Sequence, residues 1–199
     1  MDTTPANIPG YRLGDPGLVA SPVKLAELES LKATLLFGSE DAAALRRAHE
    51  VVRDQIEAIL DVWYGFVGST PHLLAYFGDP ETGQPIPAYL AAVRKRFGQW
   101  ILDTCRAEYG ASWLAWQEEI GRRHHRVGKN KADGVAAAAH VPLRYLLALI
   151  VPISVTMKPF LAKKGASATD VDAMHAAWTK AVLLQAILWA RPYVKEGDF

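Results

Sequence analysis

The sequence predicts an all-α protein, and three observations support this class. No segment shows the convincing alternation of apolar and polar residues that is typical of half-buried β-strands. Apolar residues instead recur at the three- and four-residue spacing of helices from one end of the chain to the other. With 199 residues and 50% hydrophobic content, the chain can bury one core, so we expect a single domain.

The first twenty residues predict an irregular arm ahead of this domain. Residues 1–20 contain three prolines and three glycines, which disfavour regular secondary structure. The arm also carries Ile8 and Tyr11, whose apolar side chains suggest that it packs on something. We therefore expect an arm over residues 1–20 and a single domain over residues 21–199.

Caps and chain breakers predict the helices of the first half. Ser21-Pro22 offers an N-cap and a first-turn proline to a helix that ends near Phe37. Ser39 is expected to cap a long helix that reaches about Gly68. The next helices are expected over residues 71–77 and 86–109.

The same signals predict the helices of the second half. These helices are expected over residues 111–126, 142–164 and 169–193. Pro152 is expected to kink the middle one, because a proline inside a helix removes a backbone hydrogen bond. Thr169 is expected to cap the last one, and residues 128–139 form a small, polar connection.

The last helix is apolar on nearly every side. Only Gln185 interrupts the apolar run Ala181–Ala190, so this segment must be covered all round. The simplest cover is a second subunit, paired by two-fold symmetry through the last two helices. The alternative is a central helix within a monomer.

Charge and cysteine content exclude several classes of partner and site. The formal net charge is +1, with 22 basic and 21 acidic residues, so nucleic acid and anionic membranes are not expected partners. Cys105 is the sole cysteine, which excludes an internal disulfide framework and a cysteine-based zinc site. A single cysteine also fits a reducing compartment.

Neither a signal peptide nor a membrane span is expected. The first ten residues lack the basic flank and apolar core of a secretory signal. The most apolar run, Tyr145 to Met157, is 13 residues long, whereas a membrane-spanning helix needs ~20. We therefore expect a cytoplasmic protein without a membrane partner.

Two adjacent histidines are predicted to lie on different faces of one helix. The 3.6-residue repeat places five residues on one apolar face: Trp113, Trp116, Ile120, His124 and Val127. His125 is rotated from His124 by about 100°, toward a charged face. A neutral imidazole at the end of an apolar stripe is suited to bind the iron of haem, although a hydrogen-bonded core histidine is the commoner case.

Other helices offer residues for the opposite side of such a pocket. No histidine occurs between His72 and His124, so a second axial histidine from the preceding helix is not expected. Phe97 faces the presumed cavity, and Trp63 could wall it or fill the core. Tyr64 lies on an apolar stripe, where its hydroxyl could donate to bound dioxygen or to a backbone carbonyl.

Two arginines could meet the propionates of a haem group. Arg94 and Arg96 lie on the same predicted helix as Phe97. Either guanidinium could pair with a propionate carboxylate. The alternative is a solvated basic face.

Seven segments of the chain resemble protoglobin, a single-domain relative of the globin-coupled sensor domains. They are Ile8–Tyr11, Asp61–Gly68, Tyr89–Phe97, Trp100–Cys105, Glu119–Arg126, Met157–Gly165 and Pro192–Phe199. The resemblance implies a globin-like sandwich of helices with an additional N-terminal helix, and an arm that helps to bury the haem. It also implies narrow apolar gas tunnels and homodimers formed through the last two long helices.

The resemblance further implies roles for individual residues. His124 matches the proximal ligand of haem b (iron protoporphyrin IX), and Tyr64 matches the distal-side tyrosine. Trp63 and Phe97 match distal gating residues, and Arg96 matches a propionate partner. The gases that the resemblance implies as ligands are dioxygen, carbon monoxide and nitric oxide.

One segment departs from the family pattern. Members of the family carry a Phe-Ile-Tyr-Pro run where this chain has Leu149-Ile-Val151-Pro152. Leu149 removes ring volume beside the haem, and Val151 removes a hydroxyl. We expect a roomier or differently routed pocket with altered gas kinetics.

Three functions from different classes remain open at this point. The first is reversible binding of diatomic gases for sensing, scavenging or storage. The second is a haem enzyme acting on nitric oxide, nitrite or peroxide, with latent carbene-transfer reactivity. Against this second function, the chain offers no flavin or reductase module and no distal His–Arg pair of the peroxidase type. The third is a cofactor-free helical dimer used as an interaction module.

Overall fold

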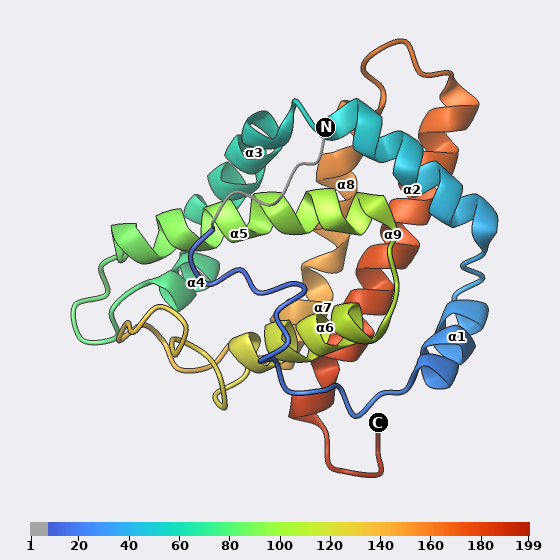
Figure 1. Ribbon diagram of the computed structural model, residues 1–199. Helices are drawn as coiled ribbons and strands as arrows, with labels where there is room; N and C mark the ends of the chain where they lie inside the picture. Colours follow the sequence, from blue (N-terminus) through green and yellow to red (C-terminus); the bar gives the residue numbers. More distant parts are fainter. Residues whose placement is uncertain (1–7) are drawn as a thin grey trace.

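The computed structural model describes residues 8–199, and within this range it contains helices and no strand (Figure 1). Its helices are α1 (Leu25–Thr34), α2 (Ser39–Val52), α3 (Ile56–Gly68), α4 (Pro71–Leu74), η1 (Ala75–Phe77), α5 (Pro87–Arg106), α6 (Ala111–His124), α7 (Leu143–Ala148), α8 (Ile150–Leu161), α9 (Ala168–Ala190) and η2 (Arg191–Tyr193). The predicted all-α class is confirmed. The first seven residues of the expected arm lie outside the described range.

The long helix expected from Ser39 to Gly68 is wrong, since the chain forms two helices there. It turns between α2 and α3, where the Gln55 side-chain amide donates to the Val51 carbonyl at 2.7 Å. That bond satisfies a carbonyl at the end of α2 that has no partner within the helix. The apolar pattern continues through the turn because Val52 and Ile59 are both buried. Periodicity alone therefore does not reveal the break.

The helix expected over residues 142–164 is also divided, but at Leu149 rather than at Pro152. Pro152 lies in the first turn of α8, where its missing N–H removes no helical hydrogen bond. Its ring would clash with the Ala148 carbonyl in a continuous helix, so α7 ends there. The cap of α9 also differs from the prediction: it is Ser167 rather than Thr169, and its hydroxyl accepts from the Asp170 N–H at 3.1 Å.

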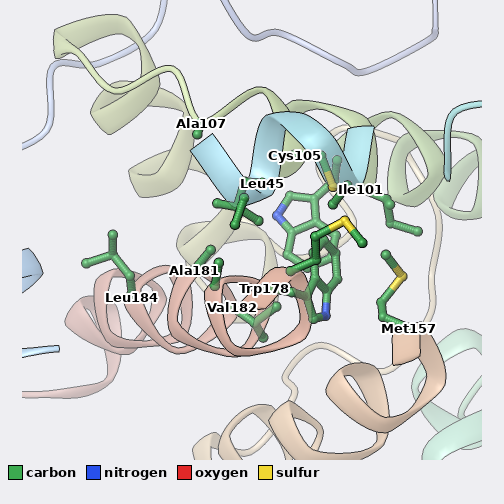
Figure 2. Close-up of a cluster of buried hydrophobic side chains, with 14 of the residues drawn as sticks. Leu45, Ile101, Cys105, Ala107, Met157, Trp178, Ala181, Val182 and Leu184 are labelled. Carbon is green, nitrogen blue, oxygen red and sulfur yellow. The ribbon is translucent and has the colours of Figure 1, made fainter. Parts of the chain in front are cut away.

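The core forms around α9, which packs against α2, α6 and α8 (Figures 1 and 2). Leu184, Gln185 and Ala186 are consecutive residues that point about 100° apart, and all three are buried. The Gln185 amide oxygen accepts from the Trp100 indole N–H at 2.7 Å, which explains a polar residue in this apolar helix. This chain alone therefore covers α9, as in the monomer alternative. A partner subunit is not needed to bury it.

The apolar stretch Leu143–Leu161 is longer than the 13-residue run on which the sequence prediction rested. It has 19 residues and a mean hydropathy of 1.4, so by length and composition alone it could cross a membrane. In the structure it is α7 and α8, which pack on α9, and α8 also packs on α3. Val151 and Val155 lie on its outer face and are 66% and 63% exposed.

Candidate functional site

A large cavity lies between α3, α5, α6 and the α7–α8 segment. Its volume is about 240 Å³. Because one buried water needs roughly 10–15 Å³ by this measure, the cavity has room for roughly twenty waters. Six residues that the sequence predicts as site residues all line it: Trp63, Tyr64, Arg96, Phe97, His124 and Leu149. The fold thus brings together residues from three helices and from the junction of α7 and α8.

His124 is the last residue of α6, and its ring lies against the cavity. Its Nδ1 is 2.9 Å from the Ile120 carbonyl oxygen, so Nδ1–H donates and Nε2 keeps its lone pair. Burial lowers the pKa of His124, which keeps the imidazole neutral at pH 7. The ring stacks on Trp189 of α9, with centroids 5.4 Å apart and planes 15° apart. These features suit a neutral imidazole that binds a metal through Nε2.

His125 lies outside this cavity. It follows the end of α6 and contacts His140 and Tyr193, with ring centroids 5.2 Å and 4.9 Å away. His72 is exposed on α4. Among the histidines of residues 8–199, His124 is therefore the one that lines the cavity. The apolar face of α6 ends at His124, the last residue of the helix. Val127, which was expected on the same face, lies beyond the helix and is 38% exposed.

The position of His124 depends on a close approach of α6 to α9. A Cβ atom on Gly121 would lie 2.9 Å from Trp189 Cα and 3.1 Å from its carbonyl oxygen. Both are backbone atoms, which cannot move aside as a flexible side chain does. Gly121 therefore lets α6 approach the helix against which the His124 ring stacks.

Replacing Gly121 by alanine should lower the free energy of unfolding by about 1–3 kcal/mol, because the added methyl group overpacks the α6–α9 contact. Alanine favours helix over glycine by about 1 kcal/mol. At a helical position without a steric clash, the same substitution would therefore raise the free energy of unfolding. Gly65 in α3 is the matched control, since a Cβ there meets nothing within 4 Å. Urea unfolding measures both variants, and equal stability of the two would contradict the close-approach explanation.

Aromatic side chains form the opposite wall of the cavity. Trp63 and Phe97 lie with ring centroids 5.6 Å apart, and Phe97 stacks on Trp100 at 5.2 Å. Tyr64 lies beside Phe97 and lines the cavity, and its hydroxyl makes no hydrogen bond to any residue of the described range. Within residues 8–199, the alternative of a tyrosine bonded to a backbone carbonyl is therefore not found. Burial raises the pKa of Tyr64, so its hydroxyl keeps its proton.

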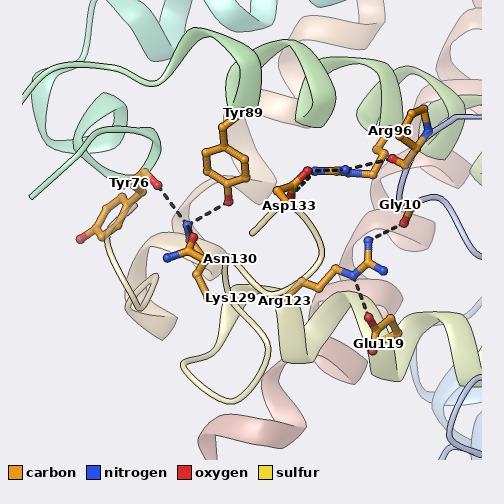
Figure 3. Close-up of polar contacts among 10 residues, drawn as sticks. Gly10, Tyr76, Tyr89, Arg96, Glu119, Arg123, Lys129, Asn130 and Asp133 are labelled. Carbon is orange, nitrogen blue, oxygen red and sulfur yellow. Dashed lines mark hydrogen bonds and ion pairs between the residues drawn. The ribbon is translucent and has the colours of Figure 1, made fainter. Parts of the chain in front are cut away.

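Charged residues gather at one end of the cavity (Figure 3). Arg96 donates from both terminal nitrogens to Asp133, at 2.9 Å and 2.8 Å, and also to the Pro9 carbonyl at 3.0 Å. Arg94 points elsewhere and pairs with Glu57 and Asp61, each at 2.8 Å. Of the two arginines considered from sequence, Arg96 is thus the one at the cavity.

The described part of the arm crosses from α5 to α6 beside this charged end (Figure 1). Arg123 of α6 donates to the Gly10 carbonyl at 2.6 Å and pairs with Glu119 at 2.8 Å. Gly10 has φ +77°, a left-handed conformation that residues with a side chain rarely adopt, so glycine is favoured there. Tyr11 lines the cavity, stacks edge-on against Trp116 and donates to Asp103.

The two substituted positions of the Leu149-Ile-Val151-Pro152 segment differ in their surroundings. Leu149 lines the cavity, so the side chain at this position forms part of its wall. Val151 points away from the cavity and is 66% exposed. The expectation that the loss of a hydroxyl at residue 151 alters the pocket is therefore wrong. Residue 151 instead contributes to the outer face of α8.

Sequence reasoning missed most of the charged end. Lys129 and Asp133 lie in the loop over residues 128–139, which carries no helical periodicity. Lys129 is 8% exposed, whereas Lys131 in the same loop is exposed. No local pattern distinguishes these two lysines. Nor does a local pattern reveal the bond of Arg123 to the backbone of the distant Gly10.

These helices, arranged around a cavity that a histidine lines, form an all-α globin-like fold. The chain is similar to the globin domain of the Geobacter sulfurreducens globin-coupled sensor, with a TM-score of 0.65 and 14% sequence identity, over 84% of this chain and 97% of that one. A comparison with curated proteins finds no significant match. The Protoglobin family model matches residues 24–199, and the chain belongs to this family. Membership implies haem-based gas binding in general.

Proposed function

We propose that this chain binds haem b through His124 Nε2 and reversibly binds dioxygen, carbon monoxide and nitric oxide. The observation that carries the proposal is the His124 ring, which faces a large apolar cavity with Nδ1 engaged and Nε2 available. Haem supplies an iron with a coordination position for a diatomic gas. The apolar walls exclude water from that position, and the basic residues at one end of the cavity suit the propionate carboxylates.

The residues opposite His124 support a gas-binding role. Trp63 and Phe97 would limit the space next to the iron, and their contact with each other makes this wall stiff. Tyr64 adds a hydroxyl without a partner among the described residues. A polar gas ligand would accept a hydrogen bond from it. Sensing, scavenging and storage of such gases are the roles that this arrangement serves.

Haem reconstitution tests this proposal. The purified chain, mixed with hemin and reduced, should develop a Soret band that shifts when carbon monoxide is added. Absence of a Soret band would contradict the proposal and also the enzyme alternative. Turnover of nitric oxide with a reductant in the same sample would favour that enzyme alternative instead.

A homodimer through α8 and α9 is part of the same proposal, as is a location in the cytoplasm. Val151 and Val155 are four residues apart on α8 and are exposed, and Leu147 at the end of α7 is exposed as well. Ala173 and Ala176 of α9 are exposed as well. An exposed apolar surface of this kind suits an interface between two copies of the chain.

Replacing Val155 by aspartate should convert this dimer into a monomer, because the charge would be buried without a partner in the interface. Sedimentation velocity measures the change in mass. Val62 on α3 is the matched control, since it is also exposed (52%) but lies on another helix. Equal masses for the wild type and Val155→Asp would contradict the α8 interface.

A further inference from the structure

Lys129 is a buried lysine whose ammonium group has no carboxylate partner within residues 8–199 (Figure 3). It donates to the Tyr89 hydroxyl at 2.9 Å, the Asn130 side-chain oxygen at 3.0 Å and the Tyr76 carbonyl at 3.1 Å. All three acceptors are neutral. Its hydrogen bonds are therefore complete, but its charge is not compensated.

The neighbouring basic residues differ from Lys129 in this respect. Arg96 is paired with Asp133, and Arg123 is paired with Glu119. The five charged side chains of this end therefore carry one net positive charge, and that charge belongs to Lys129. Asp133 is the carboxylate whose charge acts on Lys129, but both of its oxygens bond Arg96.

An uncompensated buried charge is costly, and the cost is visible in the acidity of this group. Burial lowers the pKa of Lys129 to about 8, with Asp133 opposing the shift. The side chain is still mostly charged at pH 7. Three hydrogen bonds hold it at the wall of the cavity, so the fold maintains a cation where an anion can be bound.

We infer that Lys129 binds one of the two propionate carboxylates of haem, as the charge partner that the protein itself does not supply. This inference rests on the proposed function, because that function makes haem the occupant of the cavity. Arg96, which the family resemblance assigns to a propionate, already has an internal carboxylate partner. The charge balance therefore assigns the unpaired role to Lys129, which acts as a cofactor-positioning residue.

Esterified haem tests this pairing directly. The wild type and Lys129→Gln are each loaded with haem and, separately, with haem dimethyl ester, whose propionates carry no charge. Transfer to an excess of an apo-globin acceptor then gives four dissociation rates. We expect Lys129→Gln to lose haem roughly ten- to a hundred-fold faster than the wild type, because it removes the positive charge that faces a propionate. Both proteins should lose the ester at similar rates, because the interaction has already been removed.

Two further variants complete the experiment. Lys131→Gln is the matched control, because Lys131 lies in the same loop but is exposed, and it should retain both cofactors as the wild type does. Lys129→Arg keeps the positive charge, so it should keep the preference for free haem over the ester. This variant still tests the inference if Lys129→Gln does not fold. Equal acceleration for both cofactors would mean that Lys129 only supports its loop, and would overturn the inference.

The failure of this inference and the failure of the proposed function give different results. A wild type that takes up neither haem nor its ester contradicts the proposed function. A wild type that binds both, together with Lys129→Gln rates equal to those of the wild type, contradicts only the role of Lys129.

Discussion

Replacing His124 by alanine should abolish the bond between the protein and the haem iron. The imidazole is neutral, its Nδ1 is engaged by Ile120, and its ring lines the cavity with the Nε2 lone pair unprotonated. Alanine has no donor atom, and no other histidine of residues 8–199 lines the cavity. The Soret band of the reduced carbon monoxide form should therefore shift, and haem should be lost far more quickly.

The neighbouring histidine provides the matched control for this variant. His125 lies outside the cavity, against His140 and Tyr193, so His125→Ala should leave the spectrum nearly unchanged. Added imidazole should restore much of the spectrum of His124→Ala, because the deleted ring leaves a space next to Trp189. The reverse pattern in the two variants would contradict His124 as the ligand.

Helical periodicity was sufficient to choose between these histidines, and the reason is physical. Two adjacent residues on a helix are separated by about 100°, so only one of them can share the face of Trp116 and Ile120. Burial on one side of α6 then decides which one meets the cavity. The same rule predicts one face of α3 and one face of α5 at the pocket, and Tyr64 and Phe97 on these faces line the cavity.

Features that depend on contacts between distant segments could not be read in this way. The break between α2 and α3 depends on Gln55, and the burial of Lys129 depends on oxygens from η1 and α5. Neither residue differs in type from many exposed ones. The outward position of Val151 follows from where α8 begins, which Pro152 sets through its clash with the preceding turn.

Tyr64 should act chiefly on the release of gas rather than on haem binding. Its hydroxyl has no partner within the described range, and burial raises its pKa, so it keeps a proton to donate. Bound dioxygen carries partial negative charge and accepts such a bond, whereas carbon monoxide is much less polar. A charged or strongly polar hydrogen bond contributes about 1.5–3 kcal/mol, which corresponds to a roughly ten- to hundred-fold change in a rate.

We therefore expect Tyr64→Phe to release dioxygen roughly ten- to a hundred-fold faster, with a much smaller change for carbon monoxide. Stopped-flow replacement of dioxygen by carbon monoxide gives the first rate, and replacement of carbon monoxide by nitric oxide gives the second. Phenylalanine keeps the ring that contacts Phe97, so cavity shape and haem retention should be preserved. Equal acceleration for both gases would indicate a steric effect of the ring, and an unchanged dioxygen rate would place the hydroxyl away from the bound gas.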